Sequence, residues 1–293
     1  MKMPSLGFGC SPFRAEGRRV DLEAAVRTAV GAGYRLLDVA EIYGNERAVG
    51  RALRSPTAPP RAELFLVGKV WRTNYRPAAL RQACEASLRR LGCDAFDLYL
   101  LHAPEAWRHD GPLVDPEEVS WEELERRALP RDAQGHPALD AVPLAETWEA
   151  MRDLVRRGLA GAVGVSNFVP AQIEELTAGE AELPAANQIA CSPFEPNAST
   201  VEWCQERNIR LLSHSPLSAL SGSGLLAAPR LAELAARLRR SAAQIVLRWH
   251  VQRGLVPLPS STDPVHIVEN LGALGFELDP AAMAAVDSLA GSA

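Results

Sequence analysis

The chain has 293 residues, of which 47% are hydrophobic and 23% are charged, and its formal net charge is −5 at pH 7. This balance is typical of a soluble globular protein, and no basic stretch is long enough to predict a nucleic-acid or membrane surface. The sequence has neither an apolar run of transmembrane length nor a recognisable signal peptide. We therefore expect a cytoplasmic protein.

Short apolar runs alternate with helical patterns along the whole chain. The runs predict strands at 6–9, 34–40, 64–70, 96–102, 161–167, 187–192, 209–215 and 255–261. The helical patterns lie at 21–32, 77–91, 144–157, 170–177, 199–207, 241–252, 264–271 and 274–289. The runs are rich in Val, Ile and Leu without strict polar alternation, which indicates strands that are buried on both faces.

This repeated alternation favours an α/β fold, a (β/α)8 TIM barrel, as one domain over residues 1–293. A doubly wound open sheet is the alternative, but the G-x-G-x-x-G fingerprint is missing after the first predicted strand. The segments 103–142 and 216–230 follow strands and are predicted to be long loops at the C-terminal face of the barrel. Barrels of this kind carry their functional sites at that face.

Polar side chains stand at the ends of three consecutive predicted strands. Asp38 ends the second run and Tyr43 follows it, Lys69 lies near the end of the third run, and His102 ends the fourth. Because strand ends converge at the mouth of a barrel, we expect these four side chains to meet there. Each of them alone also has an ordinary structural explanation, such as a helix cap, a packed aromatic ring or a solvated strand end.

Lys69 strengthens the functional interpretation. The chain has 31 basic residues, and only Lys2 and Lys69 are lysines. The other basic residues are all arginines. A lysine in the body of the protein therefore indicates a place where a compact, titratable cation must lie beside another group. The scattered cysteines predict free thiols, and the histidines lack metal-ligand spacing, so we expect no metal site.

With these residues in view, the sequence resembles the aldo-keto reductase family over almost its whole length. The family's catalytic tetrad falls on Asp38, Tyr43, Lys69 and His102, within "LDVAEIYGNE", "VGKVW" and "DLYLLHAP". The resemblance implies NAD(P)H-dependent reduction of an aldehyde or ketone to an alcohol. Tyr43 would be the general acid, Lys69 would lower its pKa, Asp38 would hold Lys69, and His102 would orient the substrate oxygen.

The same resemblance implies a nicotinamide cofactor, with NADP(H) as the first choice and NAD(H) as the alternative. It is carried by "GVSNF", "NQIACSPF", "SHSPL" and "HIVEN". For the carboxamide and pyrophosphate regions, the implied residues are Ser166, Asn167, Gln188, His214, Ser215 and Leu217. For the adenosine end, they are Ser260, Ser261, Thr262, His266, Glu269 and Asn270.

Three of these positions depart from the family pattern. His214 stands where a tyrosine usually stacks on the nicotinamide, and Ser260 and His266 stand where a lysine and an arginine usually hold the 2′-phosphate of NADP. A charge-assisted contact with phosphate contributes about 1.5–3 kcal/mol. Losing two such contacts predicts only a small preference for NADPH over NADH.

The resemblance also implies a substrate pocket formed by Ser11, Trp71, Ala103 and Trp107. Ser11 and Ala103 replace two tryptophans that are common in similar reductases, and the chain ends at Ala293 without the tail that often covers the pocket. Because a tryptophan covers up to about 250 Å², we expect a wide mouth and a bulky small-molecule carbonyl substrate. In the alternative, Trp107 or other parts of the 103–142 loop refill the space.

A second class of function remains open at this point. A protein of this family could keep the fold and the cofactor but act as a sensor or scaffold with little turnover. The intact tetrad favours the enzyme. Neither nucleic acid nor a membrane is an expected partner, and the sequence leaves the oligomeric state open.

Overall fold

The strands of the protein form an eight-stranded parallel sheet whose neighbours follow the order of the chain. A computed structural model describes residues 3–11, 14, 15, 18, 19, 22–109, 111, 113–177, 182–217 and 228–290. The strands are β1 (Phe8–Gly9), β4 (Leu36–Asp38), β5 (Phe65–Val70), β6 (Leu98–Leu101), β7 (Val163–Ser166), β8 (Ala186–Ala190), β9 (Arg210–His214) and β10 (Leu255–Leu258). A short antiparallel pair, β2 (Arg14–Ala15) and β3 (Arg18–Arg19), makes a separate sheet.

Hydrogen bonds between the first and last strands close the sheet into a barrel. The backbone N–H groups of Gly7 and Gly9 donate to the carbonyl oxygens of Pro257 and Pro259, at 3.0 and 2.9 Å. A Cβ atom on Gly9 would lie 2.9 Å from the carbonyl oxygen of Leu258, so the close approach requires glycine. The (β/α)8 barrel predicted from the sequence is confirmed, and the open-sheet alternative is wrong.

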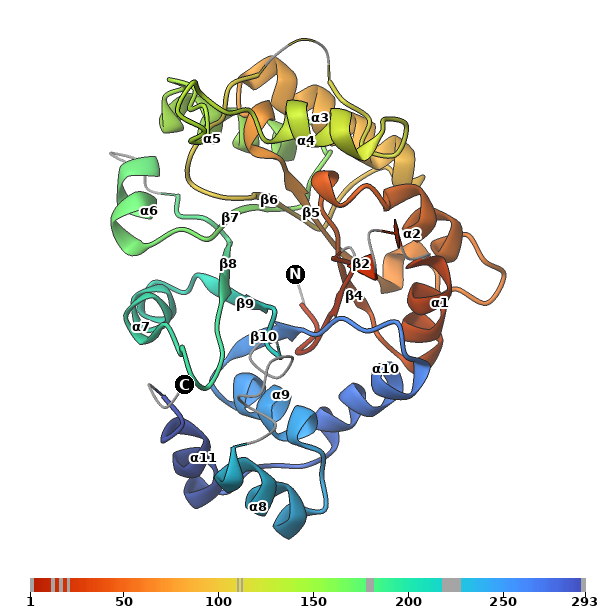
Figure 1. The fold of residues 1–293 in the computed structure, drawn as a ribbon, viewed down its shortest axis with the longest axis vertical. Helices are drawn as coiled ribbons and strands as arrows, with labels where there is room; N and C mark the ends of the chain where they lie inside the picture. Colours follow the sequence, from red (N-terminus) through yellow and green to blue (C-terminus); the bar gives the residue numbers. More distant parts are fainter. Residues whose placement is uncertain are drawn as a thin grey trace.

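Helices surround the barrel as an outer ring (Figure 1). The helices of this ring are α1 (Leu22–Ala32), α2 (Glu46–Leu53), α3 (Pro77–Leu91), α5 (Leu144–Arg156), α6 (Pro170–Leu176), α7 (Ala198–Glu206), α9 (Ala242–Gln252) and α10 (Pro264–Leu271). Two more, α8 (Pro229–Leu238) and α11 (Pro280–Asp287), lie outside the ring at its lower end. Local signals explain several boundaries: Pro77 begins α3, and Gly92, with φ of 72°, ends it.

Alternation along the strands determines which side chains reach the mouth of the barrel. Its interior cluster consists of Leu36, Phe65, Val67, Leu98, Leu100, Ala186, Leu212, Val256 and Leu258. Successive side chains of a strand point to opposite faces, so a residue two positions after an interior residue stays on the inner side. That spacing from an interior residue holds for Asp38, Lys69, His102, Gln188, His214 and Ser260.

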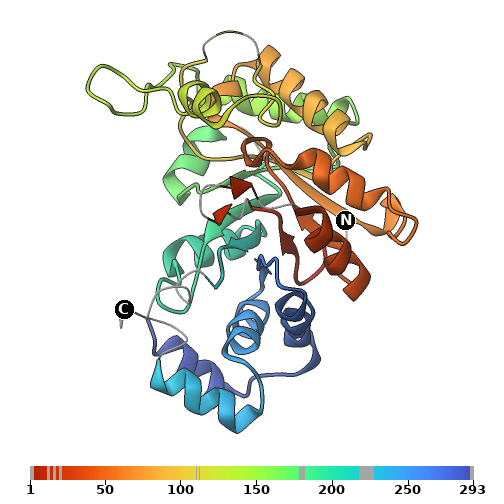
Figure 2. The same cartoon turned by 45° about the vertical axis from the view of Figure 1, so that its right-hand side comes forward.

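The segment 103–142, predicted to be a loop, contains the helix α4 (Trp121–Ala128). Ser120 caps this helix, since its Oγ accepts the N–H of Glu123 at 3.1 Å. Figure 2 shows the yellow-green part of the segment projecting at the upper end of the molecule. The prediction of a loop therefore holds for only part of this segment.

Two further boundaries differ from the prediction. The last helix begins at Pro280 instead of residue 274, because Asp279 caps it and proline suits the first helical turn. The residues before it form a 3₁₀ turn, Gly272–Gly275. The predicted loop 216–230 runs into α8, and its residues 218–227 lie outside the described part of the chain. Within the described residues, the helices lack the length and apolar character needed to cross a bilayer.

Candidate active site

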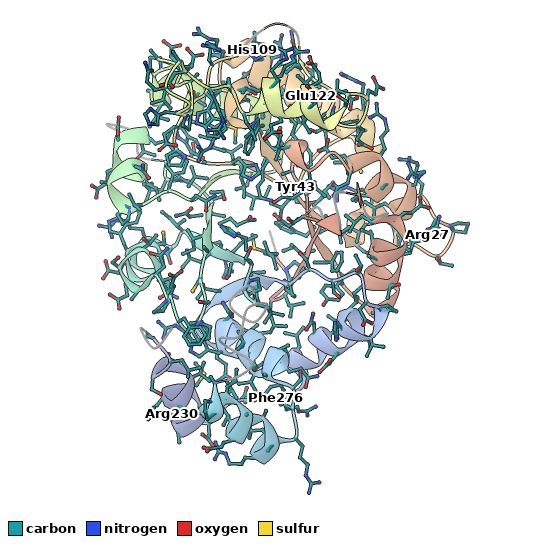
Figure 3. All side chains as sticks on the ribbon, in the orientation of Figure 1. Arg27, Tyr43, His109, Glu122, Arg230 and Phe276 are labelled. Atoms are coloured by element: carbon teal, nitrogen blue, oxygen red, sulfur yellow. The ribbon has the colours of Figure 1, made fainter. Side chains whose placement is uncertain are left out.

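A cavity of about 510 Å³ opens at the C-terminal ends of the barrel strands. Its lining residues are Gly9, Ser11, Asp38, Tyr43, His102, Ser166, Asn167, Gln188, His214, Ser215, Pro216, Leu217, Leu258, Pro259 and Ser260. In Figure 3, Tyr43 lies inside the ring of outer helices, whereas Arg27 and Arg230 lie on the outside of the molecule. The residues that line the cavity thus come from the ends of strands along most of the chain, from β1 to β10.

Lys69, Asp38 and Tyr43 form a buried polar network at this cavity. The Nζ of Lys69 donates to Oδ2 of Asp38 at 2.6 Å and to the carbonyl oxygen of Val39 at 3.1 Å, and it lies 3.3 Å from the hydroxyl of Tyr43. The other carboxylate oxygen of Asp38 accepts from Nε2 of Gln188 at 2.7 Å. The Lys69 side chain is only 1% exposed, so these contacts replace water as its partners.

Burial and charge act in opposite directions on the pKa values of this network. Burial by itself lowers the pKa of Lys69, but Asp38 and Tyr43 outweigh it and the pKa lies above its ordinary value. Burial raises the pKa of Tyr43, and Lys69 opposes this rise without cancelling it. The expected lowering by Lys69 is present, but the net shift is upward because the phenol is desolvated. Tyr43 therefore keeps its proton at neutral pH.

His102 lies beside Tyr43 as a neutral imidazole. The two rings meet edge to face with centroids 5.9 Å apart, and the ring of Trp71 also meets that of His102 edge to face at 4.9 Å. Burial, followed by the charge of Lys69, holds the pKa of His102 well below its usual range. Its buried Nδ1 has no hydrogen-bond partner within the described part of the chain. An unpartnered buried polar atom costs about 1–3 kcal/mol, so its presence calls for an explanation.

Glu41 is a buried carboxyl group that the sequence analysis missed. It begins the 3₁₀ turn that carries Tyr43 (Glu41–Tyr43). Its Oε2 accepts the backbone N–H of Trp71 at 3.0 Å, and its Oε1 accepts Nδ2 of Asn74 at 2.7 Å. The turn with Tyr43 is thereby tied to the chain that follows the strand of Lys69. Burial raises the pKa of Glu41 to about 7. An acidic residue in a turn gives no sequence signal of such burial.

We expect Glu41→Gln to remove a pH dependence of stability. The pKa in the folded state, about 7, lies above the ordinary value of 4.5, so the native state binds this proton more tightly than the unfolded state. The contribution to stability is present in full below pH 4.5 and is lost as the pH rises through 7. Relative to the variant, the wild-type free energy of unfolding should fall by about 3 kcal/mol over this window.

Urea unfolding of both proteins at intervals across this pH window measures the effect. Glu202→Gln, which removes an exposed acid on α7, is the matched control and should follow the wild type. Parallel stability curves for wild type and Glu41→Gln would show that Glu41 ionises as freely in the folded as in the unfolded chain.

One wall of the cavity carries the residues implied for the nicotinamide. Ser166 Oγ donates to the carbonyl oxygen of Gln188 at 2.9 Å, and Asn167 Nδ2 donates to the carbonyl oxygen of His102 at 3.0 Å. Asn167 and Ser215 have left-handed backbones, with φ of 63° and 51°, just after β7 and β9. Such conformations are uncommon for residues other than glycine, although asparagine adopts them more readily than serine does.

This wall suits a nicotinamide cofactor. A carboxamide has one acceptor oxygen and two donor hydrogens, and hydroxyl and amide side chains supply both kinds of partner. Ser166, Asn167 and Gln188 offer such groups along the border of the cavity. On the opposite side, the absence of a side chain on Gly9 leaves the approach to Ser260 open, since a Cβ there would lie 2.5 Å from Ser260 Oγ. These residues could hold the ring between β7, β8 and β1.

The residues implied for the adenosine end are not gathered in the cavity. Ser260 borders it, but the others lie on the segment before α10 or on α10 itself, outside the cavity lining: Ser261, Thr262, His266, Glu269 and Asn270. His266 is 63% exposed, and Asn270 is buried. The structure therefore separates the implied site into a cavity and an outer surface.

Asp263 is an acid at this outer surface that the sequence analysis did not single out. It caps α10, since its Oδ1 accepts the N–H of Val265 at 2.8 Å, and its backbone N–H donates to Ser261 Oγ at 3.0 Å. Its Oδ2 lies 3.8 Å from Nδ1 of His266. A carboxylate thus stands among the residues implied for a phosphate. The Asp-Pro pair at the start of the predicted helix is typical of a helix N-terminus and could have indicated Asp263 as the cap.

Only one of the four residues implied for the substrate pocket borders the cavity. Ser11 is exposed and lies in its lining. Ala103 is 2% exposed, and its backbone is held by the hydroxyl of Tyr75, which donates to the Ala103 carbonyl at 2.5 Å and accepts the Ala103 N–H at 3.0 Å. The alanine at this position is therefore buried and lies outside the cavity lining.

Trp71 and Trp107 pack against each other beside the cavity. Their rings meet edge to face at 5.6 Å, and Arg72 lies over the ring of Trp107 at 4.5 Å. Trp71 Nε1 donates to the carbonyl oxygen of Ala128 at 2.6 Å, which attaches the end of α4 to this pair. Neither tryptophan belongs to the cavity lining. The 103–142 segment is therefore anchored next to His102 without filling the cavity.

The cysteines and possible metal ligands of the described residues do not form a disulfide or a metal site. All five cysteines are free, and four of them are buried. Among the described residues, no group of three or more His, Cys, Asp or Glu side chains could hold a metal ion.

Comparisons with known proteins match the chain to one family. The Aldo/keto reductase family model matches residues 5–290. Aldo-keto reductase family 1 member A1 of Sus scrofa and of Homo sapiens are each 34% identical over 300 aligned positions, which cover 98% of this chain and 86% of each relative. The aldose reductase structure from Schistosoma japonicum has a TM-score of 0.86 and 32% identity, and covers 99% of this chain and 90% of its own.

A second solved structure, of the aldose reductase from Giardia lamblia, has a TM-score of 0.84 and 30% identity over 98% of this chain and 92% of its own. The likeness therefore extends over the barrel and its helices, and the match of the family model includes the three residues of the buried network and His102. This chain belongs to the aldo/keto reductase family, oxidoreductases that reduce carbonyl groups to alcohols.

Proposed function

We propose that the protein reduces an aldehyde or ketone with NAD(P)H and that Tyr43 is the general acid. The observation that carries this proposal is the buried ammonium of Lys69, 2.6 Å from Asp38 and 3.3 Å from the Tyr43 hydroxyl at the border of the cavity. A fixed ammonium stabilises the phenolate that remains after Tyr43 gives up its proton. The same pair lets Tyr43 act as general base when an alcohol is oxidised.

His102 acts on the substrate oxygen in this proposal. A neutral imidazole can donate a hydrogen bond to a carbonyl oxygen and stabilise the negative charge that develops there. A nicotinamide bound here would supply the hydride for the carbonyl carbon. Ser166, Asn167 and Gln188 would hold its carboxamide and orient the ring.

The cofactor is proposed to be NADP(H), with NAD(H) accepted nearly as well. Ser215 and Leu217 would lie along the pyrophosphate, and the hydroxyls of Ser260, Ser261 and Thr262 would lie near the 2′-position of the ribose. Asp263 and the exposed His266 stand where a phosphate would need cations. This surface offers phosphate little net attraction, which supports a weak preference.

A panel of aldehydes and ketones, assayed with NADPH and with NADH, tests the function. Oxidation of the reduced cofactor in the presence of at least one carbonyl is the expected result. Cofactor binding, measured by quenching of tryptophan fluorescence, without turnover of any carbonyl would favour a sensor or scaffold. A protein that neither binds nor oxidises the cofactor would contradict the proposal.

The substrate is proposed to be bulky, because Ser11 leaves one border of the cavity open. We expect Ser11→Trp to lower kcat/KM for bulky ketones about tenfold more than for small aldehydes, since its ring would cover up to about 250 Å². Ser11→Ala is the matched control and should leave the ratio unchanged. Ala103 is unsuited to this test because it is buried. A wild-type enzyme that clearly prefers small aldehydes would contradict the proposed substrate class.

A further inference from the structure

We propose that His214 is a positioning residue that fixes the side-chain amide of Asn167 by donating a hydrogen bond from Nε2. This inference rests on the proposed function, because the orientation of Asn167 matters to the reaction only if Asn167 holds the nicotinamide carboxamide. Nε2 of His214 lies 2.9 Å from Oδ1 of Asn167. The two residues come from β9 and from the turn after β7, on either side of β8 (Figure 1).

The surroundings of Asn167 determine which way its amide points. Its Nδ2 donates to the carbonyl oxygen of His102 at 3.0 Å and to Ser166 Oγ at 3.1 Å. A backbone carbonyl oxygen is only an acceptor, so the amide nitrogen must face it and the amide oxygen must face His214. In this orientation the Asn167 side chain links the backbone of His102, after β6, to the ring of His214 at the end of β9.

The orientation of the amide in turn determines the tautomer of His214. An amide oxygen is only an acceptor, so Nε2 of His214 must carry a proton. Its Nδ1 lies 3.4 Å from Ser215 Oγ, a hydroxyl that can donate to it. Burial, and then the charge of Lys69, lower the pKa of His214, while Asp38 opposes them. A neutral ring with its proton on Nε2 therefore satisfies both contacts.

The hydrogen bond completes the set of partners around the Asn167 amide. Asn167 has a left-handed backbone with φ of 63°, a conformation that asparagine adopts more readily than most residues, and it carries the side chain into the turn between His102 and His214. His214 supplies the partner of the amide oxygen, and His102 and Ser166 supply those of the amide nitrogen. A phenylalanine at position 214 could still stack on a ring in the cavity, but it could not donate to Asn167. Loss of the donor frees the amide to turn.

Two variants separate the donor from the ring. His214→Phe keeps an aromatic ring and removes the donor, whereas His214→Gln removes the ring and keeps an N–H donor. We expect His214→Phe to lower kcat about tenfold and to raise hydride transfer from the wrong face of the nicotinamide, with a smaller change in cofactor Kd. Facial selectivity is measured with cofactor deuterated on one face. His214→Gln should recover most of the selectivity.

Two measurements on the protein without cofactor support the test. Nitrogen NMR of labelled histidine should show His214 protonated at Nε2, and Asn167→Ala should shift that resonance. In a double-mutant cycle on the free energy of unfolding, His214→Phe should cost less in the Asn167→Ala background than in the wild type.

Protonation at Nδ1, an additive cycle, or a His214→Phe enzyme with full facial selectivity would each overturn the inference. These outcomes differ from failure of the proposed function, in which the wild-type protein shows the Nε2 tautomer and the coupling but turns over no carbonyl.

Discussion

Tyr43→Phe is expected to lower kcat for carbonyl reduction at least about a hundredfold, the usual size of a general acid–base contribution. The substitution keeps the ring that meets His102 at 5.9 Å and removes the hydroxyl that lies 3.3 Å from Lys69 Nζ. Cofactor Kd should remain nearly unchanged, because the ring still fills its place. Steady-state kinetics and fluorescence quenching measure the two quantities separately.

Tyr34→Phe is the matched control for that substitution. Tyr34 is a buried tyrosine whose hydroxyl donates to the carbonyl oxygen of Ile267 at 3.1 Å, and it does not border the cavity. We expect this variant to lose some stability and to keep its kcat. Full activity in Tyr43→Phe would mean that another group supplies the proton to the alkoxide.

The double substitution Ser260→Lys with His266→Arg is expected to tighten NADPH binding by about a hundredfold and to leave NADH nearly unchanged. Two charge-assisted contacts with the 2′-phosphate would contribute about 1.5–3 kcal/mol each, and NADH lacks that phosphate. The gain should shrink at high salt, because the contacts at this exposed surface are screened. Titrations with both cofactors at two ionic strengths measure it.

Asp263→Asn isolates the charge of the acid at the same surface. Asparagine retains a side-chain oxygen that can cap α10, so the helix should persist while the repulsion of phosphate is removed. This single variant should tighten NADPH by a smaller factor and leave NADH unchanged. A wild-type protein that already prefers NADPH strongly would show that hydroxyls and backbone amides hold the phosphate, contrary to our interpretation of Ser260 and His266.

Helix boundaries show where sequence signals are sufficient. The helices at 77–91 and 264–271 were predicted with their observed bounds, because proline begins both and glycine follows both. The helix α2 was missed, and it contains Gly50, which lowers helix propensity. The structure explains this glycine, since a Cβ there would lie 2.5 Å from the carbonyl oxygen of Leu91 on α3. A contact between two helices gives no signal in either segment alone.

The sequence by itself determined the order of the eight barrel strands and the polar residues at the ends of three of them. Both depend on local periodicity: an apolar run ends, and the residue two positions past an interior side chain again faces inward, as Asp38, Lys69 and His102 do. The choice of lysine over arginine at position 69 was also visible in the chain's own composition.

Only the tertiary structure decided how deeply each group is buried and which groups border the cavity. The net rise in the pKa of Tyr43 depends on desolvation by surrounding segments, which outweighs the single charge of Lys69. Ala103 is buried with its backbone bonded to the hydroxyl of Tyr75, and Trp71 is bonded to the carbonyl of Ala128, whereas Ser11 borders the cavity. These outcomes depend on contacts between residues far apart in the chain, and such contacts leave no mark in local sequence patterns.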